Sequence, residues 1–419
     1  MLDRRGLFGV FLLLAIFVGL HVGFAPEHHE PSTTAAVMLG GIAFLLMSTS
    51  VILATRARIL ESAFGGLDRM YQVHKLSGIS ASLFVLLHFF TIPKKLPLGV
   101  DPISNPLAPS GPLGMVALIL LVISIGLALN RKISYNRWRG PHKAMGLVYV
   151  LVIGHFMTAP GIFFEKFSVS GYFLIVVATI GLVSLLYSLF GMNRATGRRF
   201  KIEAVNTLER ATELVLSPLE ETMTFTAGQF AFVEIQDKGW SEPHPFTVSS
   251  SPNEPNLRFT MKVLGDWTRK VREGLEPGGE VIVRGPYGRF DSAQARPKQI
   301  WLAGGIGITP FLSKVRAMSA DDIREITLVY ATRNRAEALF LDELRERASD
   351  LPRFRIVTLF SDESEFARVE KMKEEIDGQL SDFDFFLCGP KPMLKALTKD
   401  LKSVGVSGKT IHTEAFEFR

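Results

Sequence analysis

The sequence predicts a multi-domain protein: a six-helix transmembrane bundle, then an antiparallel β-barrel, then an α/β domain with a parallel sheet. Six long apolar stretches fill residues 1–192. Short segments of alternating apolar and polar residues, separated by turn residues, follow at 196–295 and are typical of antiparallel strands. Residues 297–419 alternate strand-like and helix-like segments, which favours a parallel sheet.

The composition averages two unlike halves. The chain has 419 residues, of which 47% are apolar and 21% charged. Its net charge of +6 requires no nucleic acid partner, because much of the excess comes from Arg and Lys beside the apolar stretches. The single cysteine, Cys388, excludes an intramolecular disulfide, a cysteine-ligated iron–sulfur cluster and covalent CxxCH haem attachment.

The apolar stretches are long enough to cross a hydrocarbon core of about 30 Å at about 1.5 Å per residue. They lie near residues 7–25, 36–54, 73–92, 113–129, 142–160 and 171–190. The first stretch follows Arg4 and Arg5 as in a signal peptide, but no A-x-A cleavage site comes after it. We therefore expect a retained helix and six spans.

Basic residues predict the orientation of these spans. With six spans, most Arg and Lys residues near the span ends fall on one side of the membrane. These are Arg4, Arg5, Arg56, Arg58, Arg131, Lys132, Arg137, Arg139, Arg194, Arg198 and Arg199. The sequence therefore predicts an integral protein of a bacterial inner membrane, surrounded by lipid, with both termini and the soluble half in the cytoplasm.

Two of the apolar stretches each contain two histidines. His74 and His88 lie in the third stretch, and His142 and His155 lie in the fifth. Fourteen residues correspond to about 21 Å and nearly four helical turns, so His74 and His88 share one helix face. Thirteen residues place His142 and His155 off a common face, unless a π-bulge or a distorted first turn after Pro141 realigns them.

Neutral imidazole is a good axial ligand for haem iron, and ionisable residues inside a membrane are usually functional. The depths predict two stacked b-type haems, one held by His74 and His142 and the other, nearer the outer face, by His88 and His155. Small residues beside the ligands would let a porphyrin approach the helix backbones: Ser77, Gly78, Gly146 and Gly154. Helix-packing histidines and glycines are the alternative. Four histidines at matched depths in alternate helices favour the haem ligands.

The predicted barrel contains HPFTVSSSP at 244–252, KVLGDWT at 262–268 and GPYGRF at 285–290. In this order and spacing the motifs resemble the FAD domain of the ferredoxin-NADP reductase superfamily, in the form used by NADPH oxidases and ferric reductases. The resemblance implies that Phe246 packs beside the isoalloxazine and that Thr247 forms a hydrogen bond near N5. It implies FAD contacts for His244, Pro245, Phe246, Thr247, Lys262, Gly265, Asp266, Trp267 and Thr268, the last five forming a pyrophosphate loop.

A strand, glycine-rich turn and helix follow in QIWLAGGIGITPFLSKVRAM. Such a turn presents backbone N–H groups and a helix N-terminus to a phosphate. With ITLVYATRNRAEALF and FDFFLCGPKPMLKAL, it resembles the nicotinamide module of the same superfamily. The resemblance implies nucleotide contacts for Gly304, Gly305, Gly307, Thr309, Pro310, Arg333, Cys388, Gly389 and Pro390.

Arg333 matches the position where the family commonly meets a 2′-phosphate, which favours NADPH and leaves NADH possible. Cys388 matches a position near the nicotinamide ring; a small buried apolar residue is the alternative. The C-terminal IHTEAFEFR resembles the family's ending, in which an aromatic ring covers the flavin. This role falls on Phe416, with Phe418 in reserve, unless both rings simply bury themselves in a core. Thr247, Cys388 and Phe416 are the candidate catalytic residues.

Over nearly its whole length the chain resembles the prokaryotic NADPH oxidase and ferric reductase-like transmembrane flavocytochromes b. The resemblance implies electron transfer from cytosolic NADPH through FAD and two b-type haems to an acceptor at the outer face, with no obligatory protein partner. O2 is the favoured acceptor. An Fe(III) chelate stays the alternative, because Ile92 stands where animal oxidases have a further histidine.

Two other classes of protein are compatible with parts of the sequence. An electron-supply subunit would pass electrons to a periplasmic partner or a quinone, with the Pro-rich segment 93–112 as its docking surface. A nucleotide-regulated six-helix transporter would leave the four histidines and the flavin motif unexplained.

Overall fold

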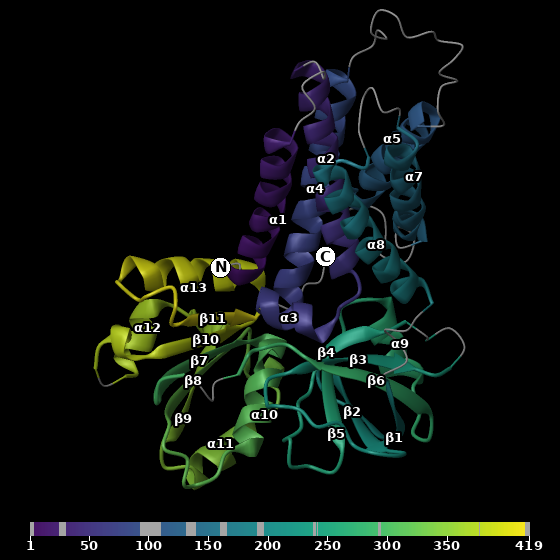
Figure 1. Cartoon of the computed structure of the whole chain (residues 1–419). Coiled ribbons are helices and arrows are strands. Elements are labelled where there is room, and N and C mark those ends of the chain that lie inside the picture. The colour runs from purple at the N-terminus through teal and green to yellow at the C-terminus, as the bar shows by residue number, and fades with distance from the viewer. Residues whose placement is uncertain are drawn as a thin grey trace, which may run out of the picture. The chain divides into compact units, whose positions relative to one another are not determined.

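The computed structural model describes ten segments of the chain. They are residues 4–24, 31–92, 110–130, 140–159, 166–190, 197–237, 240, 242–291, 295–376 and 378–414. The chain forms two compact units, residues 2–195 and residues 196–419 (Figure 1).

The first unit is helical. Its helices are α1 (Arg4–Gly23), α2 (Pro31–Leu53), α3 (Arg58–Phe64), α4 (Leu67–Thr91), α5 (Ser110–Leu129), α7 (Met145–Met157) and α8 (Val169–Leu189). Among the described residues, five helices are long and apolar enough to cross a membrane: α1, α2, α4, α5 and α8. The predicted count of six is not confirmed. The 13 residues of α7 extend about 20 Å, less than a core of about 30 Å.

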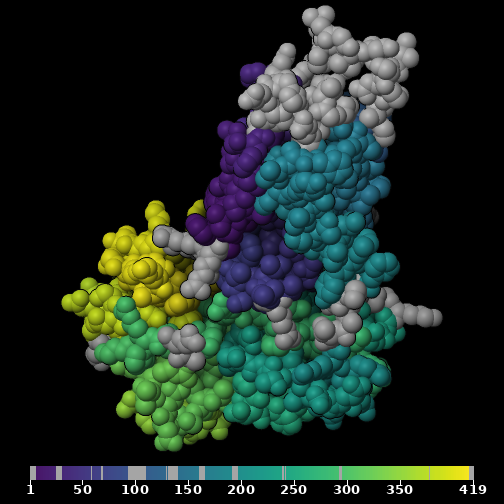
Figure 2. Space-filling model, viewed as in Figure 1, coloured from purple at the N-terminus to yellow at the C-terminus, as the bar shows by residue number. Residues whose placement is uncertain are grey.

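The long helices are apolar on their outer faces as well as inside. Phe8 and Phe11 on α1, the purple helix in Figure 2, are 67% and 68% exposed. A helix on the surface of a soluble domain would carry polar residues there. Inside the unit, the Ser48 hydroxyl lies 2.9 Å from the Tyr149 hydroxyl, so the polar groups of α2 and α7 satisfy each other. The unit therefore has the surface of a membrane domain.

An antiparallel sheet begins the second unit. It contains β1 (Arg198–Thr207), β2 (Ala211–Pro218), β3 (Phe230–Ile235), β4 (His244–Thr247), β5 (Leu257–Lys262) and β6 (Glu280–Tyr287), with α9 (Asp266–Gly274) beside them. The order is β4-β3-β6-β1-β2-β5, and a single bridge between Val248 and Phe259 links its two ends. The sheet is therefore nearly closed around an apolar core that includes Phe200 and Leu214. A fully closed barrel is not confirmed.

A five-stranded parallel sheet completes the unit and confirms the predicted α/β domain. Its strands are β7 (Lys298–Gly304), β8 (Glu325–Thr332), β9 (Phe354–Phe360), β10 (Asp384–Cys388) and β11 (Ile411–Glu414), in the order β11-β10-β7-β8-β9. Four short 3-10 helices lie between the strands: η2 (Gly305–Ile308), η3 (Arg335–Glu337), η4 (Ser361–Glu363) and η5 (Leu380–Asp382).

Helices cover both faces of the parallel sheet. Alternate β7 side chains point to opposite faces, because successive residues of a strand do so. Trp301 packs in one core with α10 (Thr309–Ala317) and α11 (Leu341–Asp350). Leu302 packs in the other with α12 (Val369–Glu374) and α13 (Lys391–Ser403). Burial on both faces explains why these strands are almost continuously apolar.

Candidate redox sites

The structure brings the four membrane histidines together in two pairs. The ring centroids of His74 and His142 are 6.1 Å apart with the planes at 76°, and those of His88 and His155 are 6.1 Å apart at 77°. Two imidazole nitrogens that bind one metal from opposite sides, at about 2 Å each, lie about 4 Å apart. The short distance from each nitrogen to its ring centre brings the centroids close to the observed separation. Both pairs therefore fit an iron between them.

Hydrogen bonds orient three of these rings. Nδ1 of His74 lies 2.9 Å from the Ser50 carbonyl oxygen, and Nδ1 of His88 lies 2.7 Å from that of Ala36. Nδ1 of His155 lies 2.7 Å from the Ser110 carbonyl oxygen. A carbonyl can only accept, so each Nδ1 donates its proton, and a neutral ring then carries its lone pair on Nε2. This is how proteins usually orient a metal-binding histidine.

Two glycines that the sequence reasoning missed make room for the rings of His88 and His155. A Cβ at Gly40 would lie 2.9 Å from Nδ1 of His88, and one at Gly114 would lie 2.8 Å from Nδ1 of His155. Each glycine stands four residues, about one helical turn, after the carbonyl that accepts the histidine proton. The same arrangement on α2 and on α5 places both rings against a helix backbone.

The small residues named from the sequence have other neighbours. A Cβ at Gly146 would lie 2.9 Å from Cδ1 of Leu185, and one at Gly154 would lie 3.2 Å from Cδ1 of Leu113. Both glycines therefore allow helices to pack closely, which is common between membrane helices. A Cβ at Gly78 would lie 3.7 Å from the Ser50 hydroxyl oxygen, and Ser77 is buried. Gly40 and Gly114 accommodate the imidazole rings, whereas space for a porphyrin beside these four residues stays a prediction.

If a haem is held between His88 and His155, Gly114→Val should remove it, because the added methyl groups would displace His155 from its carbonyl partner. Gly126→Val on the same helix is the matched control, since a Cβ there meets nothing within 4 Å. Both variants place a β-branched residue in α5, so their effects on the helix itself are similar. Haem per protein, measured by absorption of the purified protein, should fall by about half only in Gly114→Val. Equal haem contents in the two variants would contradict this role.

The chain between His142 and His155 is not one regular helix. Residues 140–143 are helical, a turn follows at Ala144, and α7 begins at Met145. The Ala144 N–H bonds to the Pro141 carbonyl at 3.0 Å, and the Leu147 N–H bonds to the Ala144 carbonyl at 2.9 Å. These contacts span three residues instead of four and tighten the turn. This distorted turn, with no π-bulge needed, breaks the rotation that would otherwise separate the two histidines.

The HPFT segment forms β4, with Phe246 beside Trp267 of α9. The rings of Phe246 and Trp267 stack at 5.6 Å and 25°, and the rings of His244 and Trp267 are 4.4 Å apart. Thr247 is 3% exposed, and its Oγ1 has no hydrogen-bond partner in the described part of the chain. A buried hydroxyl without a partner is costly, so a ligand atom that bonds to it would be favoured. The segment therefore fits the flavin contact that the resemblance implies.

The KVLGDWT segment joins β5 to α9. Lys262 is the last residue of β5, and Asp266 is the first residue of α9. In β4, Pro245 pairs with Phe232 of β3. The Thr268 hydroxyl accepts from the N–H groups of Leu264 at 3.0 Å and Gly265 at 3.1 Å. These bonds fix the loop, so that the first-turn N–H groups of α9 are the donors a diphosphate would meet.

The glycine-rich turn and the Cys-Gly-Pro segment lie side by side at the carboxyl ends of β7 and β10. A Cβ at Gly307 would lie 2.2 Å from the Cys388 carbonyl oxygen, and one at Gly304 would lie 2.9 Å from Cδ of Pro390. Gly305 has φ +55°, a left-handed conformation that favours glycine. Thr309 and Pro310 then begin α10, and Gly389 packs against Gly304.

The strand order reverses direction between β7 and β10. From β7 the chain proceeds outward through β8 and β9, then crosses to β10 and β11 on the other side. Such a switch point opens a crevice at the carboxyl ends of the strands, where nucleotides bind in doubly wound sheets. Arg333 follows β8 directly at the same edge and is exposed. Cys388 is fully buried, and burial raises the pKa of its thiol, which therefore stays protonated. Phe416 and Phe418 lie outside the described residues.

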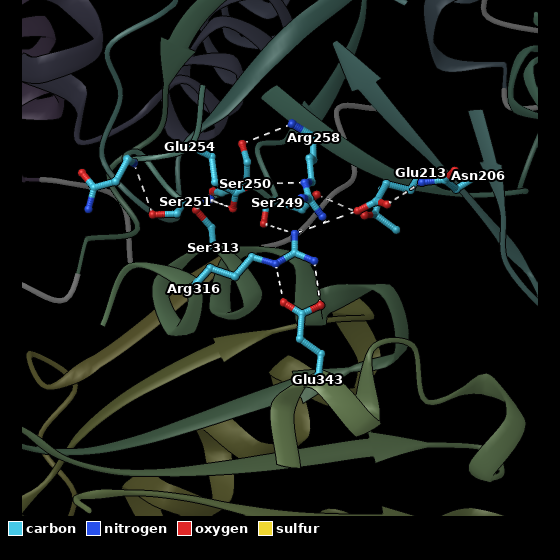
Figure 3. Close-up of polar contacts among 12 residues, drawn as sticks. Asn206, Glu213, Ser249, Ser250, Ser251, Glu254, Arg258, Ser313, Arg316 and Glu343 are labelled. Carbon is cyan, nitrogen blue, oxygen red and sulfur yellow. Dashed lines mark hydrogen bonds and ion pairs between the residues drawn. The ribbon is translucent and has the colours of Figure 1, made fainter. Parts of the chain in front are cut away.

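An arginine that the sequence did not single out fastens α10 to the flavin segment (Figure 3). Nε and Nη2 of Arg316 donate to the two carboxylate oxygens of Glu343 at 2.6 and 2.8 Å. Nη1 donates to the Ser249 carbonyl at 2.8 Å and lies 3.9 Å from Oε1 of Glu213. Ser313 on the same helix donates to the Ser250 carbonyl at 2.7 Å. The helix after the glycine-rich turn is thus tied to the serines that follow HPFT.

Arg316→Met is expected to destabilise this unit by about 3 kcal/mol, because it leaves Glu213 and Glu343 without their buried partner. The value lies at the low end of the usual cost, since the Glu343 side chain is 34% exposed. Arg199→Met is the control: its pair with Glu280 is exposed and screened by solvent, so its loss should change stability little. Thermal unfolding of the purified full chain checks both variants, and equal melting temperatures would contradict the role of Arg316.

Three family models match the chain in succession. A ferric reductase like transmembrane component matches residues 39–153, an FAD-binding domain matches 198–291, and an oxidoreductase NAD-binding domain matches 301–399. This is the domain architecture of membrane-spanning, flavin-dependent and NAD(P)H-dependent oxidoreductases. The chain thus combines a ferric reductase-like membrane domain with FAD-binding and NAD-binding domains, the architecture that the motifs implied.

Curated relatives match about half of the chain. A flavohemoprotein of Rhizobium meliloti is 26% identical over 244 residues, covering 52% of this chain and 60% of the relative. The glycine betaine monooxygenase reductase subunit of Chromohalobacter salexigens is 31% identical over 206 residues, covering 46% and 56% respectively. The chain thus spans less than two thirds of either relative.

A solved flavohemoglobin of Malassezia yamatoensis with bound FAD and heme has a similar fold. It is 19% identical, with 93% of this chain and 99% of that chain covered and a TM-score of 0.52. At this identity the likeness concerns the fold alone.

Proposed function

We propose that the chain passes electrons from cytosolic NADPH through FAD and two b-type haems to an acceptor at the outer face of the membrane, foremost O2. The two histidine pairs carry this proposal. They have equal centroid separations, and three of the four rings are oriented by backbone carbonyls. A bis-histidine haem carries one electron at a time, which suits a relay that starts from a two-electron donor.

The membrane half of the chain would hold the two haems. His74 with His142 would hold the inner haem and His88 with His155 the outer haem, and the helix at 140–143 together with α7 would complete a fifth of six spans. Both termini would be cytoplasmic, as the basic residues predict. The histidines on α4 are 14 residues apart, about 21 Å along the helix. The two pairs therefore lie at different depths.

The soluble half would bind the two cofactors at the segments already described. The Thr247 hydroxyl would orient the flavin near N5, and the α9 N-terminus with Lys262 would meet its diphosphate. The glycine-rich turn and Cys388 to Pro390 would hold NADPH at the switch point. Phe416 would cover the flavin face until nicotinamide docks.

The decisive experiment compares acceptors. Purified protein in detergent receives NADPH, and reduction of cytochrome c is measured with and without superoxide dismutase, beside reduction of an Fe(III) chelate. Dismutase-sensitive cytochrome c reduction is expected for an oxidase. A second candidate function, ferric chelate reduction, is favoured by the ferric reductase like transmembrane component and would give Fe(III) reduction without superoxide. NADPH oxidation with neither product would contradict both functions.

Arg333→Ala is expected to raise the KM for NADPH about tenfold while changing that for NADH little. Hydrogen bonds to charged groups contribute about 1.5 to 3 kcal/mol, and an exposed side chain lies at the low end. Arg335→Ala is the control, because Arg335 is also exposed and stands two residues away. Steady-state kinetics with both nucleotides checks the expectation. A selective rise of the NADPH KM in Arg335→Ala alone would show that the 2′-phosphate partner has been misassigned.

A further inference from the structure

Lys314 on α10 places an ammonium group inside a cage of aromatic rings. The residue is 4% exposed, and its Nζ has no hydrogen-bond partner in the described part of the chain. Nζ lies 4.5 Å from the ring centroid of Phe290, 4.6 Å from that of Phe386, 5.5 Å from Trp301 and 5.8 Å from Phe311. Ring faces attract a cation, but they do not neutralise it. The side chain is therefore a buried charge that its surroundings offset only in part.

The ammonium lies at the join between the flavin segment and the nicotinamide segment. Cε of Lys314 is 2.9 Å from the position a Cβ would take at Gly228, two residues before Phe230. Phe230 lies opposite Thr247 in the β3–β4 pair. On the other side, the cage rings share one core with Cys388 at the end of β10. The charge thus lies between the strand that pairs with the HPFT segment and the core that contains Cys388.

Several charged groups act on this ammonium. Burial is the largest effect and lowers the pKa of Lys314 to about 7. Asp291 after β6 and Glu414 on β11 act in the opposite direction, and Arg324 before β8 lowers the pKa further; the Cys388 thiol on β10 is protonated and carries no charge. Near neutral pH the group therefore exists in both protonation states.

A positive charge between the flavin segment and the nicotinamide segment would affect hydride transfer between the two rings. The C4–H bond of the nicotinamide breaks, an N5–H bond forms on the isoalloxazine, and the electron pair moves with the hydride. Negative charge therefore arrives on the flavin, and positive charge remains on the nicotinamide ring. In a buried site of low dielectric constant, a fixed cation favours the arrival of negative charge beside it more strongly than it would in water.

We propose that Lys314 is an electrostatic positioning residue for flavin reduction, whose buried ammonium holds the join at a positive potential and raises the reduction potential of FAD. The role rests on the proposed function, because it requires FAD at the HPFT segment and nicotinamide at the Cys-Gly-Pro segment. No hydrogen bond to either ring is required of the lysine.

The first test compares Lys314→Met with Lys298→Met in the full-length protein. Lys298 is the matched control: its Nζ lies 5.6 Å from the Phe383 ring, but its side chain is 43% exposed and it pairs with Glu325. Redox titration at pH 6 should show the two-electron reduction of FAD about tenfold less favourable in Lys314→Met, which corresponds to about 30 mV. Lys298→Met should match the wild type. An unchanged FAD potential in Lys314→Met would overturn the proposal.

The second test uses pH. The difference between wild type and Lys314→Met should shrink as the pH rises above about 7, because the wild-type ammonium loses its proton. The FAD potential falls with pH in every variant because reduction takes up protons, but Lys314→Arg should match the wild type at pH 6 and lie above it by pH 9, since a guanidinium does not deprotonate in this range. If Lys314→Met does not fold, the comparison of wild type with Lys314→Arg still tests the proposal. Parallel pH profiles for these two proteins would refute the titration of Lys314.

A third readout needs neither FAD nor NADPH. The pKa of Lys314 is lower in the folded protein, about 7, than its ordinary 10.5, so between these values the folded state binds fewer protons than the unfolded state. The buried ammonium therefore lowers the free energy of unfolding by its full amount below pH 7, and by less as the pH rises towards 10.5. Lys314→Met should therefore melt at a higher temperature than wild type at pH 7.

The two readouts separate the possible failures. A higher melting temperature with an unchanged FAD potential would show that Lys314 is only a buried charge, and would overturn the role in flavin reduction. Wild-type protein that binds no FAD would overturn the proposed function itself.

Discussion

His74→Ala and His155→Ala are each expected to remove about one haem of two and to leave the other in place. Each substitution deletes a ligand from a different pair, because His74 faces His142 and His155 faces His88. A bis-histidine site rarely survives the loss of an axial ligand. The absorption spectrum of the purified wild type should be that of low-spin b-type haem, and the haem-to-protein ratio should fall by about half in each variant.

His21→Ala is the control for this experiment. His21 is also a buried histidine of the membrane unit, but its Nε2 lies 3.1 Å from the Thr34 carbonyl oxygen and its ring stacks on Phe17 at 5.7 Å. It therefore has the contacts of a helix-packing histidine and should leave both haems in place. A full haem complement in His74→Ala and His155→Ala would remove the basis of the electron relay. Equal losses in all three variants would indicate general unfolding instead.

The sequence predicted the positions of the histidines well, but not the chain path that pairs them. Depth in an apolar stretch follows from counting residues, because the rise per residue of a helix is nearly constant. The rotation between His142 and His155 does not follow, because the helix is interrupted at Ala144. From the sequence, a distortion after Pro141 could be stated only as a condition for aligning the two histidines. Its form depends on hydrogen bonds that compete with those of a regular helix.

The supporting residues of the histidines lay beyond sequence reasoning. Gly40 and Gly114 stand on other helices than the rings they accommodate, and Ala36 and Ser110 accept the histidine protons through backbone carbonyls, which every residue has. Glycines near the ligands in sequence serve helix packing instead. A contact between two separate helices cannot be recognised from the spacing of neighbouring residues. A motif within one helical turn can be recognised in this way.

The soluble half was more predictable because its motifs are local. A strand, a glycine turn and a helix follow one another in GGIGITP, and the close approach of Gly307 to the Cys388 carbonyl explains why a glycine must stand there. By contrast, nothing in the local sequence singles out Arg316 and Lys314, because lysine and arginine side chains are mostly exposed in proteins. Only the packing of α10 shows that Lys314 is buried and that the Arg316 side chain is 7% exposed.

His88→Ala is expected to stop electron delivery at the outer face almost completely while NADPH still reduces the flavin at its normal rate. Removal of His88 leaves His155 without its partner ring, so the outer haem is lost, and the next carrier lies about 21 Å further along α4. Flavin reduction depends on the soluble unit, whose cores at the two sheets contain no membrane residue. Stopped-flow absorption measures the flavin step, and reduction of an impermeant acceptor measures delivery.

Thr247→Ala provides the opposite pattern and completes the comparison. Its buried hydroxyl is proposed to orient the flavin, so the variant should slow flavin reduction by NADPH while keeping both haems. The two variants then fail at opposite ends of one path. A His88→Ala protein that still reduced the impermeant acceptor would show that electrons leave before the second histidine pair. The haem pairs would in that case not form a transmembrane relay, whatever their ligands.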